Sequence, residues 1–277
     1  MKLKLKIGHH VSTAKSIDLA FDRARAMHYT AMQLFVSNPR KWRADMPRNE
    51  QIDSFKAKHN AFGIEPVAHM PYLPNLASSN KEIYSKSLEA FNEQINLCKI
   101  LGIRKLVVHP GSNKNRKEGI ENVANAANSI EHKGVELVIE NSALQGNSIG
   151  DLNEVFEIYD LIEGEKGICI DTCHTFAAGY EINAGFVKLF EGMHGFDYLS
   201  VIHLNDSKYE LNSRKDRHEN IGFGKIGTKN FASFFSSFPI SKLESTSIIL
   251  ETPSSEKISE AAEFGLVKRI ISNAAKL

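Results

Sequence analysis

Long hydrophobic runs are missing from this sequence, and their absence excludes a membrane-spanning protein. No run approaches the roughly 18 apolar residues that a transmembrane helix needs, and charged residues interrupt the longest apolar blocks. Low-complexity tracts are absent too, and hydrophobic residues make up 42% of the 277 residues. This composition is that of a folded globular protein. Residues 1–6 alternate between Lys and apolar residues without an apolar core, so we expect no secretory signal.

Cysteine is scarce, and neither sign of charge is in excess. Cys98, Cys169 and Cys173 are too few for a disulfide framework, which predicts a reducing, cytoplasmic environment. Lys and Arg number 34 against 33 for Asp and Glu, which leaves a net charge of +1. Such a balance does not by itself predict a nucleic-acid or a membrane partner. We expect no membrane partner and a monomeric chain.

Eight short apolar runs are present instead, each followed by a polar loop and a helical pattern. The runs cover residues 5–11, 31–36, 64–69, 103–109, 135–140, 167–171, 199–204 and 247–251. They are rich in Val, Ile and Leu and hardly alternate, as expected for parallel strands buried on both faces. Eight strands and helices in about 250 residues predict an α/β fold, a (β/α)8 TIM barrel forming a single domain over residues 1–277. A doubly wound open sheet is the alternative, but no Gly-rich phosphate loop follows the first run.

Two of the intervening helices have clear sequence signatures. Apolar residues at positions 84, 88, 91, 95 and 98 form one stripe of a helix that we expect to end at Gly102. Asp151 and Glu154 have the spacing of a capping box and predict the start of another helix.

Five of the eight runs end in a His, Asp or Glu, and a sixth has His at its last position but one. These residues are His69, His109, Glu140, Asp171, His203 and Glu251. In a TIM barrel the carboxyl ends of the strands form the face that carries the active site. If the six side chains point into the barrel, the residues two positions earlier do so as well. Those residues are all small or medium apolar ones: Val67, Val107, Val138, Cys169, Val201 and Ile249. We therefore predict a packed apolar layer beneath a polar mouth.

Carboxylates and imidazoles crowded into one buried mouth would destabilise one another without a cation, so the set predicts bound metal. Three further candidates lie nearby: His174 follows the sixth run, and Asp216 and His218 have a spacing that points both side chains the same way on an extended segment. Nine ligands exceed the needs of one tetrahedral ion and suit two or three zinc ions, with manganese or iron as alternatives. We do not expect Cys173, the nearest thiol, to be a ligand. Paired ions bridged by a carboxylate are typical of phosphoester hydrolysis.

Nine motifs are spread along the chain. They are GHHVS (8–12), FVSNPRKW (35–42), HPGS (109–112), IEN (139–141), CIDTCHTFAAGY (169–180), HLNDSK (203–208), SRKDRH (213–218), IGFGKIG (221–227) and LETP (250–253). Together they resemble endonuclease IV, the family of zinc-dependent apurinic/apyrimidinic endonucleases of base excision repair. Three places depart from the family pattern: His9, Lys15-Ser16 in place of a Gly pair, and Leu144 in place of Gly.

The resemblance implies a zinc-dependent hydrolase of the deoxyribonuclease IV type with three zinc ions per chain. The implied ligand sets are His69, His109 and Glu140 for the first ion, Glu140, Asp171, His203 and Glu251 for the second, and His174, Asp216 and His218 for the third. The implied catalytic carboxylates are Glu140, Asp171 and Glu251. The implied reaction is hydrolysis of the phosphodiester bond 5′ to an abasic site, which leaves 3′-hydroxyl and 5′-deoxyribose phosphate ends, together with removal of 3′ blocking groups.

The resemblance also implies that the barrel mouth binds damaged double-stranded DNA. Arg40, Tyr72 and Leu73 match positions that enter the duplex while the abasic nucleotide is flipped out. Lys208 and Arg214 belong to a basic loop of the same face. Basic residues gather in three loops of that face, at 40–48, 114–117 and 208–225, as contacts with phosphates require.

Two other functions fit part of this pattern. A sugar isomerase or epimerase on the same barrel would hold a single metal with Glu140, Asp171, His203 and Glu251, but it would leave the other five candidates idle. A non-catalytic protein that binds damaged DNA would have no need for nine metal ligands.

Overall fold

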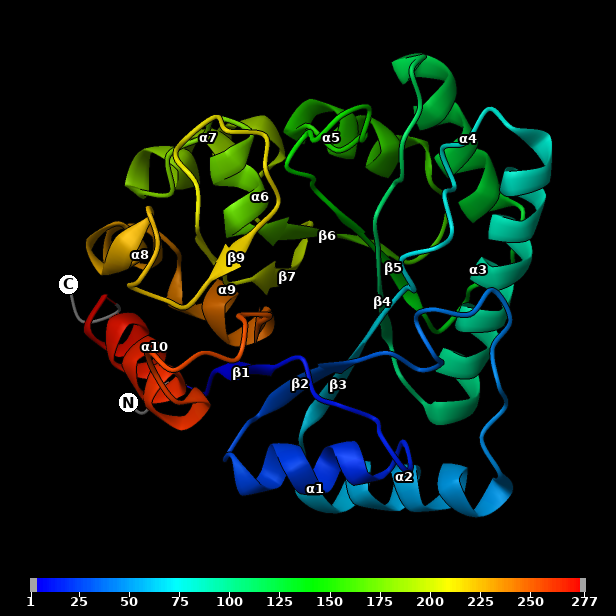
Figure 1. Cartoon of the computed structure of the whole chain (residues 1–277), viewed down its shortest axis with the longest axis horizontal. Coiled ribbons are helices and arrows are strands. Elements are labelled where there is room, and N and C mark those ends of the chain that lie inside the picture. Colours follow the sequence, from blue (N-terminus) through cyan, green and yellow to red (C-terminus); the bar gives the residue numbers. More distant parts are fainter. Residues whose placement is uncertain (1–3, 275–277) are drawn as a thin grey trace.

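Eight parallel strands lie in one sheet, and helices surround it (Figure 1). The computed structural model describes residues 4–274. The strands are β1 (Lys6–His9), β2 (Ala31–Leu34), β3 (Glu65–His69), β4 (Lys105–Val108), β5 (Glu136–Glu140), β6 (Lys166–Asp171), β7 (Leu199–His203) and β10 (Ser247–Leu250). Seven of the predicted runs contain one of these strands and the run at 167–171 starts one residue inside β6, so all eight predicted strands are confirmed.

The order of the strands makes the sheet a barrel. It runs β1-β10-β7-β6-β5-β4-β3-β2, with every neighbouring pair parallel. The two edge strands meet beyond their ends, where His10 forms a parallel bridge with Gln33 and the N–H of Val11 donates to the Gln33 carbonyl at 2.7 Å. The barrel is therefore nearly closed, and the alternative of a doubly wound open sheet is wrong.

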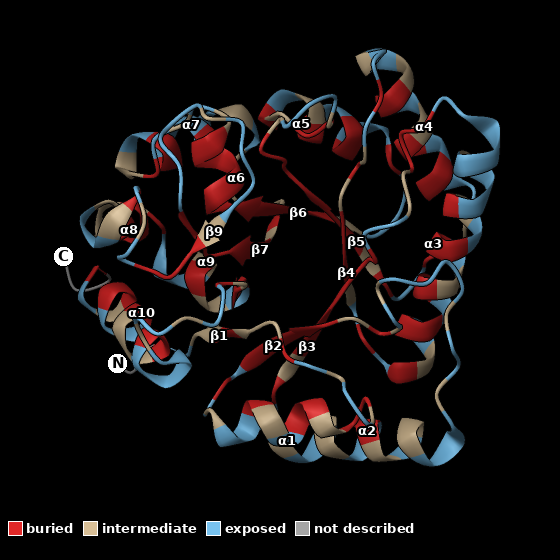
Figure 2. Cartoon of the chain, viewed as in Figure 1, coloured by how far each residue is buried: buried red, intermediate tan, exposed pale blue. Residues whose placement is uncertain are grey.

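Ten helices connect and cover the strands within residues 4–274. They are α1 (Leu19–Ala26), α2 (Asn49–Phe62), α3 (Lys81–Leu101), α4 (Arg116–Asn128), α5 (Leu152–Leu161), α6 (Thr172–Ala177), α7 (Ala184–His194), α8 (Gly227–Ser236), α9 (Ile240–Ser245) and α10 (Glu260–Ala274). Figure 2 shows buried residues along the strands and on the helix faces turned toward them. None of the helices in the described part combines the length and the apolar character needed to cross a membrane.

The two predicted helix signatures have their expected positions. The side chain of Asn80 caps α3 by accepting from the N–H groups of Glu82 and Ile83, and Gly102 ends the helix with a φ of 74°. The capping box is also present, because Glu154 accepts from the N–H of Asp151 at 3.0 Å at the start of α5. Both helices thus begin or end where the side chains satisfy backbone groups that the helix leaves free.

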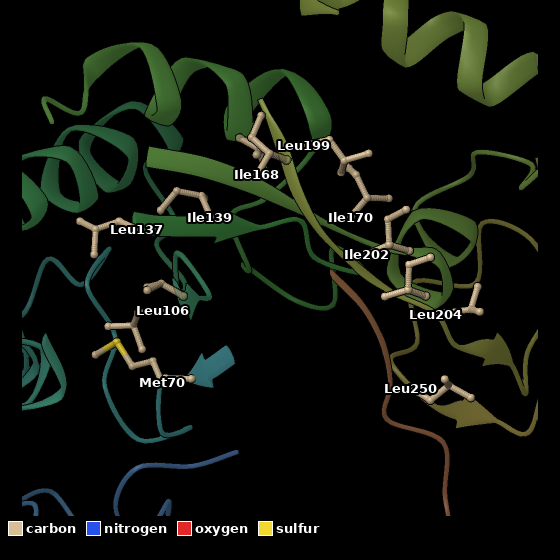
Figure 3. Packing of buried hydrophobic residues seen from close by; sticks show 14 of the residues in the cluster. Met70, Leu106, Leu137, Ile139, Ile168, Ile170, Leu199, Ile202, Leu204 and Leu250 are labelled. Carbon is tan, nitrogen blue, oxygen red and sulfur yellow. The ribbon is translucent and has the colours of Figure 1, made fainter. Parts of the chain in front are cut away.

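Side chains along the strands alternate between two apolar cores. The inner one is a ring of fully buried residues: Ala31, Val67, Val107, Val138, Cys169, Val201 and Ile249. The alternate positions, among them Leu106, Leu137, Ile168 and Ile202, belong to the larger core between the strands and the helices (Figure 3). The predicted inner layer is confirmed, and the period of two along a strand then directs the residues two positions later into the mouth.

Two of the departures from the family pattern carry an unusual backbone. Lys15 and Leu144 have φ values of 74° and 55°. The left-handed conformation costs a residue with a Cβ about 1–2 kcal/mol. The loops after β1 and β5 therefore adopt, at these two residues, a backbone conformation that favours glycine.

Candidate metal centre

Glu140, at the carboxyl end of β5, is the centre of a cluster of histidines in the barrel mouth. Its Oε2 lies 3.3 Å from Nε2 of both His69 and His109. Its Oε1 lies 2.9 Å from Nδ1 of His203 and 3.5 Å from Nδ1 of His174. Only 1% of Glu140 is exposed, so no bulk water screens these groups from one another. One carboxylate is thus in a position to bridge more than one cation.

Three more carboxylates complete the cluster. His203 Nδ1 lies 3.3 Å from Glu251 Oε2 and 4.0 Å from Asp171 Oδ2. His174 Nε2 lies 3.2 Å from Asp216 Oδ1. Asp216 lies between β8 (Asp206–Ser207) and β9 (His218–Glu219), which pair in a short antiparallel ribbon after β7. The long loop therefore folds back over the mouth and adds its ligand candidates to those of the strands.

The structure brings all nine sequence-predicted candidates together. Groups whose potential ligand atoms lie within 4.8 Å of one another include His69–His109–Glu140, His69–His203–Glu251 and His174–Asp216–His218. The first and the third group coincide with two of the three sets that the sequence implied. The binding of ions by these residues stays a prediction.

Three of the histidines bond a backbone carbonyl through one ring nitrogen. The pairs are His69 Nδ1 with Met70 O at 2.7 Å, His174 Nδ1 with Asn141 O at 3.0 Å and His218 Nδ1 with Glu251 O at 3.3 Å. A carbonyl only accepts, so Nδ1 must carry a proton in each case. Nε2 is then the ring nitrogen that is left to bind a metal ion, which is the usual arrangement of metal-binding histidines.

His218 provides a direct test of whether a cation fits. Its Nε2 is buried and has no hydrogen-bond partner in the described part of the chain. Nevertheless it lies 3.5 Å from Asp171 Oδ2 and 3.4 Å from Asp216 Oδ1. A buried lone pair that faces two carboxylates is unfavourable, because all three groups are acceptors. A cation between them would bond to all three, and imidazole with carboxylate is a donor set that suits Zn²⁺.

Three carboxylates of the cluster, Glu140, Glu251 and Asp216, are ionised at neutral pH. Burial raises the pKa of Glu140, but the histidines around it, His109 and His203 foremost, hold that pKa well below its usual range. Glu251 behaves in the same way: burial raises its pKa, and His203 outweighs that effect. Burial also raises the pKa of Asp216, yet its bond to His174 lowers the value to about 2. All three carboxylates are therefore available as anionic ligands.

Two cysteines, Cys169 and Cys173, also lie within reach of candidate ligands of the cluster. Burial raises the pKa of Cys169 to about 12 and raises that of Cys173 further. Both side chains are therefore neutral thiols, whereas a cysteine ligates a metal as the thiolate. Cys169 is a member of the inner apolar ring, as the sequence predicted.

Sequence reasoning missed the amides that orient the carboxylates. Asn141 accepts from the N–H of Asp171 at 2.7 Å, and Asn205 donates to Asp171 Oδ2 at 2.7 Å. Asn205 also accepts from the N–H of Glu251 at 2.9 Å. Both amides follow a strand end within a motif, and this position was the signal that could have identified them. Gln33, which follows Met32 in β2, gave no such signal, because its run has no charged or histidine residue at its end.

A pocket of about 450 Å³ adjoins the cluster. His109, His174 and Asp216 line one part of it, and Tyr72 and Leu73 line another. The two apolar side chains are unusually open to solvent, with exposed fractions of 69% for Tyr72 and 39% for Leu73. The loop after β3 thus presents an aromatic and an aliphatic side chain at the rim of the candidate metal centre.

The basic residues of this face are only partly free. Arg40, Lys208 and Arg214, which the sequence singled out, are exposed. Arg116 instead donates from Nε to Glu154 at 2.6 Å, and Lys225 pairs with Glu210 at 2.6 Å. The predicted basic patch is therefore smaller than the sequence suggested, because carboxylates of the same chain pair with these two residues and also with Lys41 and Lys117.

Comparison with known proteins agrees with this geometry. The model of the xylose isomerase-like TIM barrel family matches residues 21–267. The chain is 37% identical to the "Probable endonuclease 4" of Sulfurihydrogenibium sp. (strain YO3AOP1), over 96% of this chain and 99% of that protein. The chain belongs to the endonuclease IV family. A family member from Thermoplasma acidophilum is 40% identical, over 80% of this chain and 81% of its own.

Solved structures show the same fold. Endonuclease IV from Thermus thermophilus has a TM-score of 0.80 at 29% identity, over 98% of this chain and 99% of that one. A D-tagatose 3-epimerase-like protein has a TM-score of 0.75 at 20% identity, over 98% and 99% of the two chains. The second similarity reflects the barrel alone, so the choice between a nuclease and an epimerase depends on the site.

Proposed function

We propose that this endonuclease IV family member is a DNA repair enzyme that hydrolyses the phosphodiester bond 5′ to abasic sites in duplex DNA. The products would be a 3′-hydroxyl and a 5′-deoxyribose phosphate, and 3′ blocking groups would be removed at the same site. Three zinc ions, held by the nine residues of the cluster, would be the cofactor. The observation that carries the proposal is the protonation pattern of the histidines: His69, His174 and His218 each bond a carbonyl through Nδ1 and turn Nε2 inward.

The residues of the cluster have distinct parts in this proposal. Glu140 would bridge ions, since four histidines from four elements approach its two oxygens. Asp171 and Glu251 would hold the second ion from neighbouring sides of His203. When bound, the zinc ions would supply a Lewis acid that neutralises the phosphate and makes a water molecule nucleophilic. Asn141 and Asn205 keep the Asp171 carboxylate oriented toward that centre.

The rim of the mouth supports double-stranded DNA as the substrate. Tyr72 and Leu73 would fill the space that the missing base leaves, while the sugar enters the pocket beside His109. Flipping costs least at an abasic nucleotide, since no base has to be unstacked. Arg40, Lys208 and Arg214 would contact phosphates, which predicts that affinity falls as the salt concentration rises. The chain would act as a monomer in the cytoplasm, on DNA of the nucleoid.

The decisive experiment uses a DNA duplex with one tetrahydrofuran abasic analogue. This analogue cannot undergo β-elimination, so any strand break must be hydrolytic. We expect the zinc-loaded protein to cut on the 5′ side and leave a 3′-hydroxyl, as identified by mass spectrometry of the products, and we expect chelation to abolish the cut. An intact duplex after incubation with fully zinc-loaded protein would contradict the proposal.

A substitution at the centre of the cluster tests the role of Glu140. Glu140→Gln keeps the size of the side chain but removes the charge that would bridge two cations, so we expect cleavage to fall by at least about 100-fold. Glu65→Gln is the matched control, because Glu65 is a partly buried carboxylate at the opposite end of the barrel. It should cut at the wild-type rate at 25 °C. Full activity of Glu140→Gln at saturating zinc would exclude the bridging role.

A sugar epimerase is the other function to which this barrel is suited. Such an enzyme would need only Glu140, Asp171, His203 and Glu251. The buried Nε2 of His218, which faces two carboxylates without a partner in the described chain, has no purpose in that case. Epimerisation of ketohexoses together with an intact tetrahydrofuran duplex would favour this alternative.

A further inference from the structure

Gln33 lies beneath the candidate metal centre and connects two of its members, together with the neighbouring His10. It belongs to β2, and its side chain is fully buried. Its Oε1 lies 2.7 Å from Nε2 of His203. Its Nε2 lies 2.5 Å from Oε1 of Glu251 and 3.1 Å from Nδ1 of His10. No other side chain in the described residues bonds to both His203 and Glu251.

The orientation of this amide follows from its partners. The NH₂ of Gln33 faces the Glu251 carboxylate, so a donor meets an acceptor there. The Gln33 carbonyl oxygen then faces His203, and this oxygen cannot donate. The Nε2 of His203 must therefore carry a proton. The reverse orientation of the amide would place two acceptors against each other at one end and two donors at the other.

The consequence for His203 is a fixed ring nitrogen for the metal. With a proton held on Nε2 by the Gln33 carbonyl, Nδ1 is the ring nitrogen of His203 that is left to bind a metal ion. This nitrogen faces Glu140, Glu251 and Asp171 at 2.9, 3.3 and 4.0 Å. In His69, His174 and His218 the protonated ring nitrogen is fixed by a backbone carbonyl, which a side-chain substitution does not remove. His203 alone depends on a side chain.

We infer that Gln33 is a positioning residue that preorganises the second zinc set by fixing the protonation of His203 and the orientation of Glu251 at the same time. This inference rests on the proposed zinc centre and assigns no contact between Gln33 and the substrate. Groups that orient metal ligands in this way typically change metal affinity by about 10- to 100-fold when they are removed. The effect should fall on one of the three ions, because both candidate ligands that Gln33 touches, His203 and Glu251, belong to one set.

The test measures zinc binding and the histidine ring directly. Zinc is titrated into the purified apoprotein in competition with a chromophoric chelator, and His203 is observed by ¹⁵N NMR of histidine-labelled protein. For Gln33→Leu we expect one of three zinc ions to bind about 10- to 100-fold more weakly. We also expect the Nε2–H of His203 to lose the ¹⁵N signature of a hydrogen-bonded group, because leucine offers no acceptor.

Two further variants separate positioning from general damage to the fold. Gln33→Glu keeps the acceptor for His203 but places a carboxylate against Glu251, so His203 should retain its signature while zinc affinity still falls. Gln94→Leu is the matched control, because Gln94 is also a buried glutamine but bonds to Ser37, outside the cluster. It should bind three zinc ions as the wild type does.

The outcomes are distinct from those of the cleavage assay. Three zinc ions bound to Gln33→Leu with wild-type affinity, with an unchanged His203 spectrum, would overturn the inference. A wild-type protein that binds three zinc ions but leaves abasic DNA intact would refute the proposed reaction, and the role of Gln33 in zinc binding would still stand on the titration.

Discussion

Asp206 shows at the scale of single residues how the loop near the metal centre keeps its shape. The buried carboxylate accepts from the N–H groups of five residues: Ser207, Gly222, Gly224, Ile226 and Gly227. The chain can wrap this closely only where a side chain is absent. A Cβ on Gly224 would lie 2.4 Å from Asp206 Oδ1 and 2.5 Å from the carbonyl oxygen of Ser207. This close approach explains why the middle glycine of the IGFGKIG motif, Gly224, has no side chain.

Replacing this glycine should destabilise the protein. For Gly224→Ala we expect a loss of about 1–3 kcal/mol in the free energy of unfolding, since the methyl group forces backbone atoms apart. Urea denaturation followed by circular dichroism measures this difference. Gly192→Ala is the control, because a Cβ there meets no atom within 4 Å. It lies inside α7 and should be stabilising by about 0.5–1 kcal/mol. Equal stability of the two variants would contradict the explanation.

The sequence identified charged and histidine residues of the site far better than amides. His69, Glu140 and Asp171 could be found because strand ends on one face of a barrel converge, and this rule needs no knowledge of contacts. Gln33 could not be found in the same way. Its role depends on partners in β7 and after β10, which only the closed barrel brings together. The ion pair between Arg116 and Glu154 was missed for the same reason.

At the scale of elements, α3 begins at one well-defined side chain. Asn80 accepts from the N–H groups of Glu82 at 3.0 Å and Ile83 at 3.1 Å. These are two of the backbone groups that the first turn of a helix leaves without partners. For Asn80→Ala we expect a loss of about 1 kcal/mol in the free energy of unfolding. Thermal and urea denaturation would measure it.

A second asparagine of the same helix is the matched control. Asn92 is exposed and lies inside α3. Alanine is the better helix former, so Asn92→Ala should be neutral or stabilising by roughly 0.5 kcal/mol. If both variants lose the same stability, the cap is not the reason for the loss at position 80.

The helices and strands were predictable because each type has its own pattern of apolar residues in the sequence. The strands appeared as short Val- and Ile-rich runs, and α3 as a stripe of apolar residues with a glycine at its end. The ribbon of β8 and β9 was not predicted as strands. Each of these strands has only two residues, too few for any pattern, and Asp206 and the glycines around it hold the segment by tertiary contacts.

At the scale of the whole molecule, the two ends of the barrel carry different polar groups. The candidate metal ligands lie at the carboxyl ends of the strands, and ion pairs between Glu and Lys lie at the amino ends. At the amino ends of the strands, Glu65 pairs with Lys105 at 2.8 Å and with Lys6 at 2.6 Å. Burial raises the pKa of Glu65, but the two ammonium groups outweigh this effect and lower the value to about 2. Lys105 also donates to Ser247 in β10 at 3.1 Å, so these contacts connect β1, β3, β4 and β10 across the barrel.

The lowered pKa predicts how stability depends on pH. A carboxylate with a depressed pKa stabilises the fold above the pKa of the unfolded chain, and this contribution is lost as the pH falls through the folded value. For Glu65 it amounts to about 3 kcal/mol at pH 7. We expect Glu65→Gln to lower the free energy of unfolding most above about pH 5. The difference from wild type should shrink as the pH falls toward about 3.

Urea denaturation at several pH values measures this effect. Glu157→Gln is the control, because Glu157 is exposed on α5 and has no ion pair in the described residues. Its stability should follow the wild type at every pH. A constant difference between Glu65→Gln and wild type from pH 7 to pH 3 would show that the ion pairs do not cause the effect.

The pairing of β1 with β10 has a consequence for protein synthesis. Glu251 follows β10 and is the last of the nine candidate ligands to leave the ribosome. A growing chain can already expose the histidines of β3, β4 and β7 while the barrel is still open. The second ion would then lack one carboxylate, and β1 would lack its partner. Under the proposed function, an unfinished chain would be unable to cleave chromosomal DNA, because the set of candidate ligands is complete only once the last strand and Glu251 have been made.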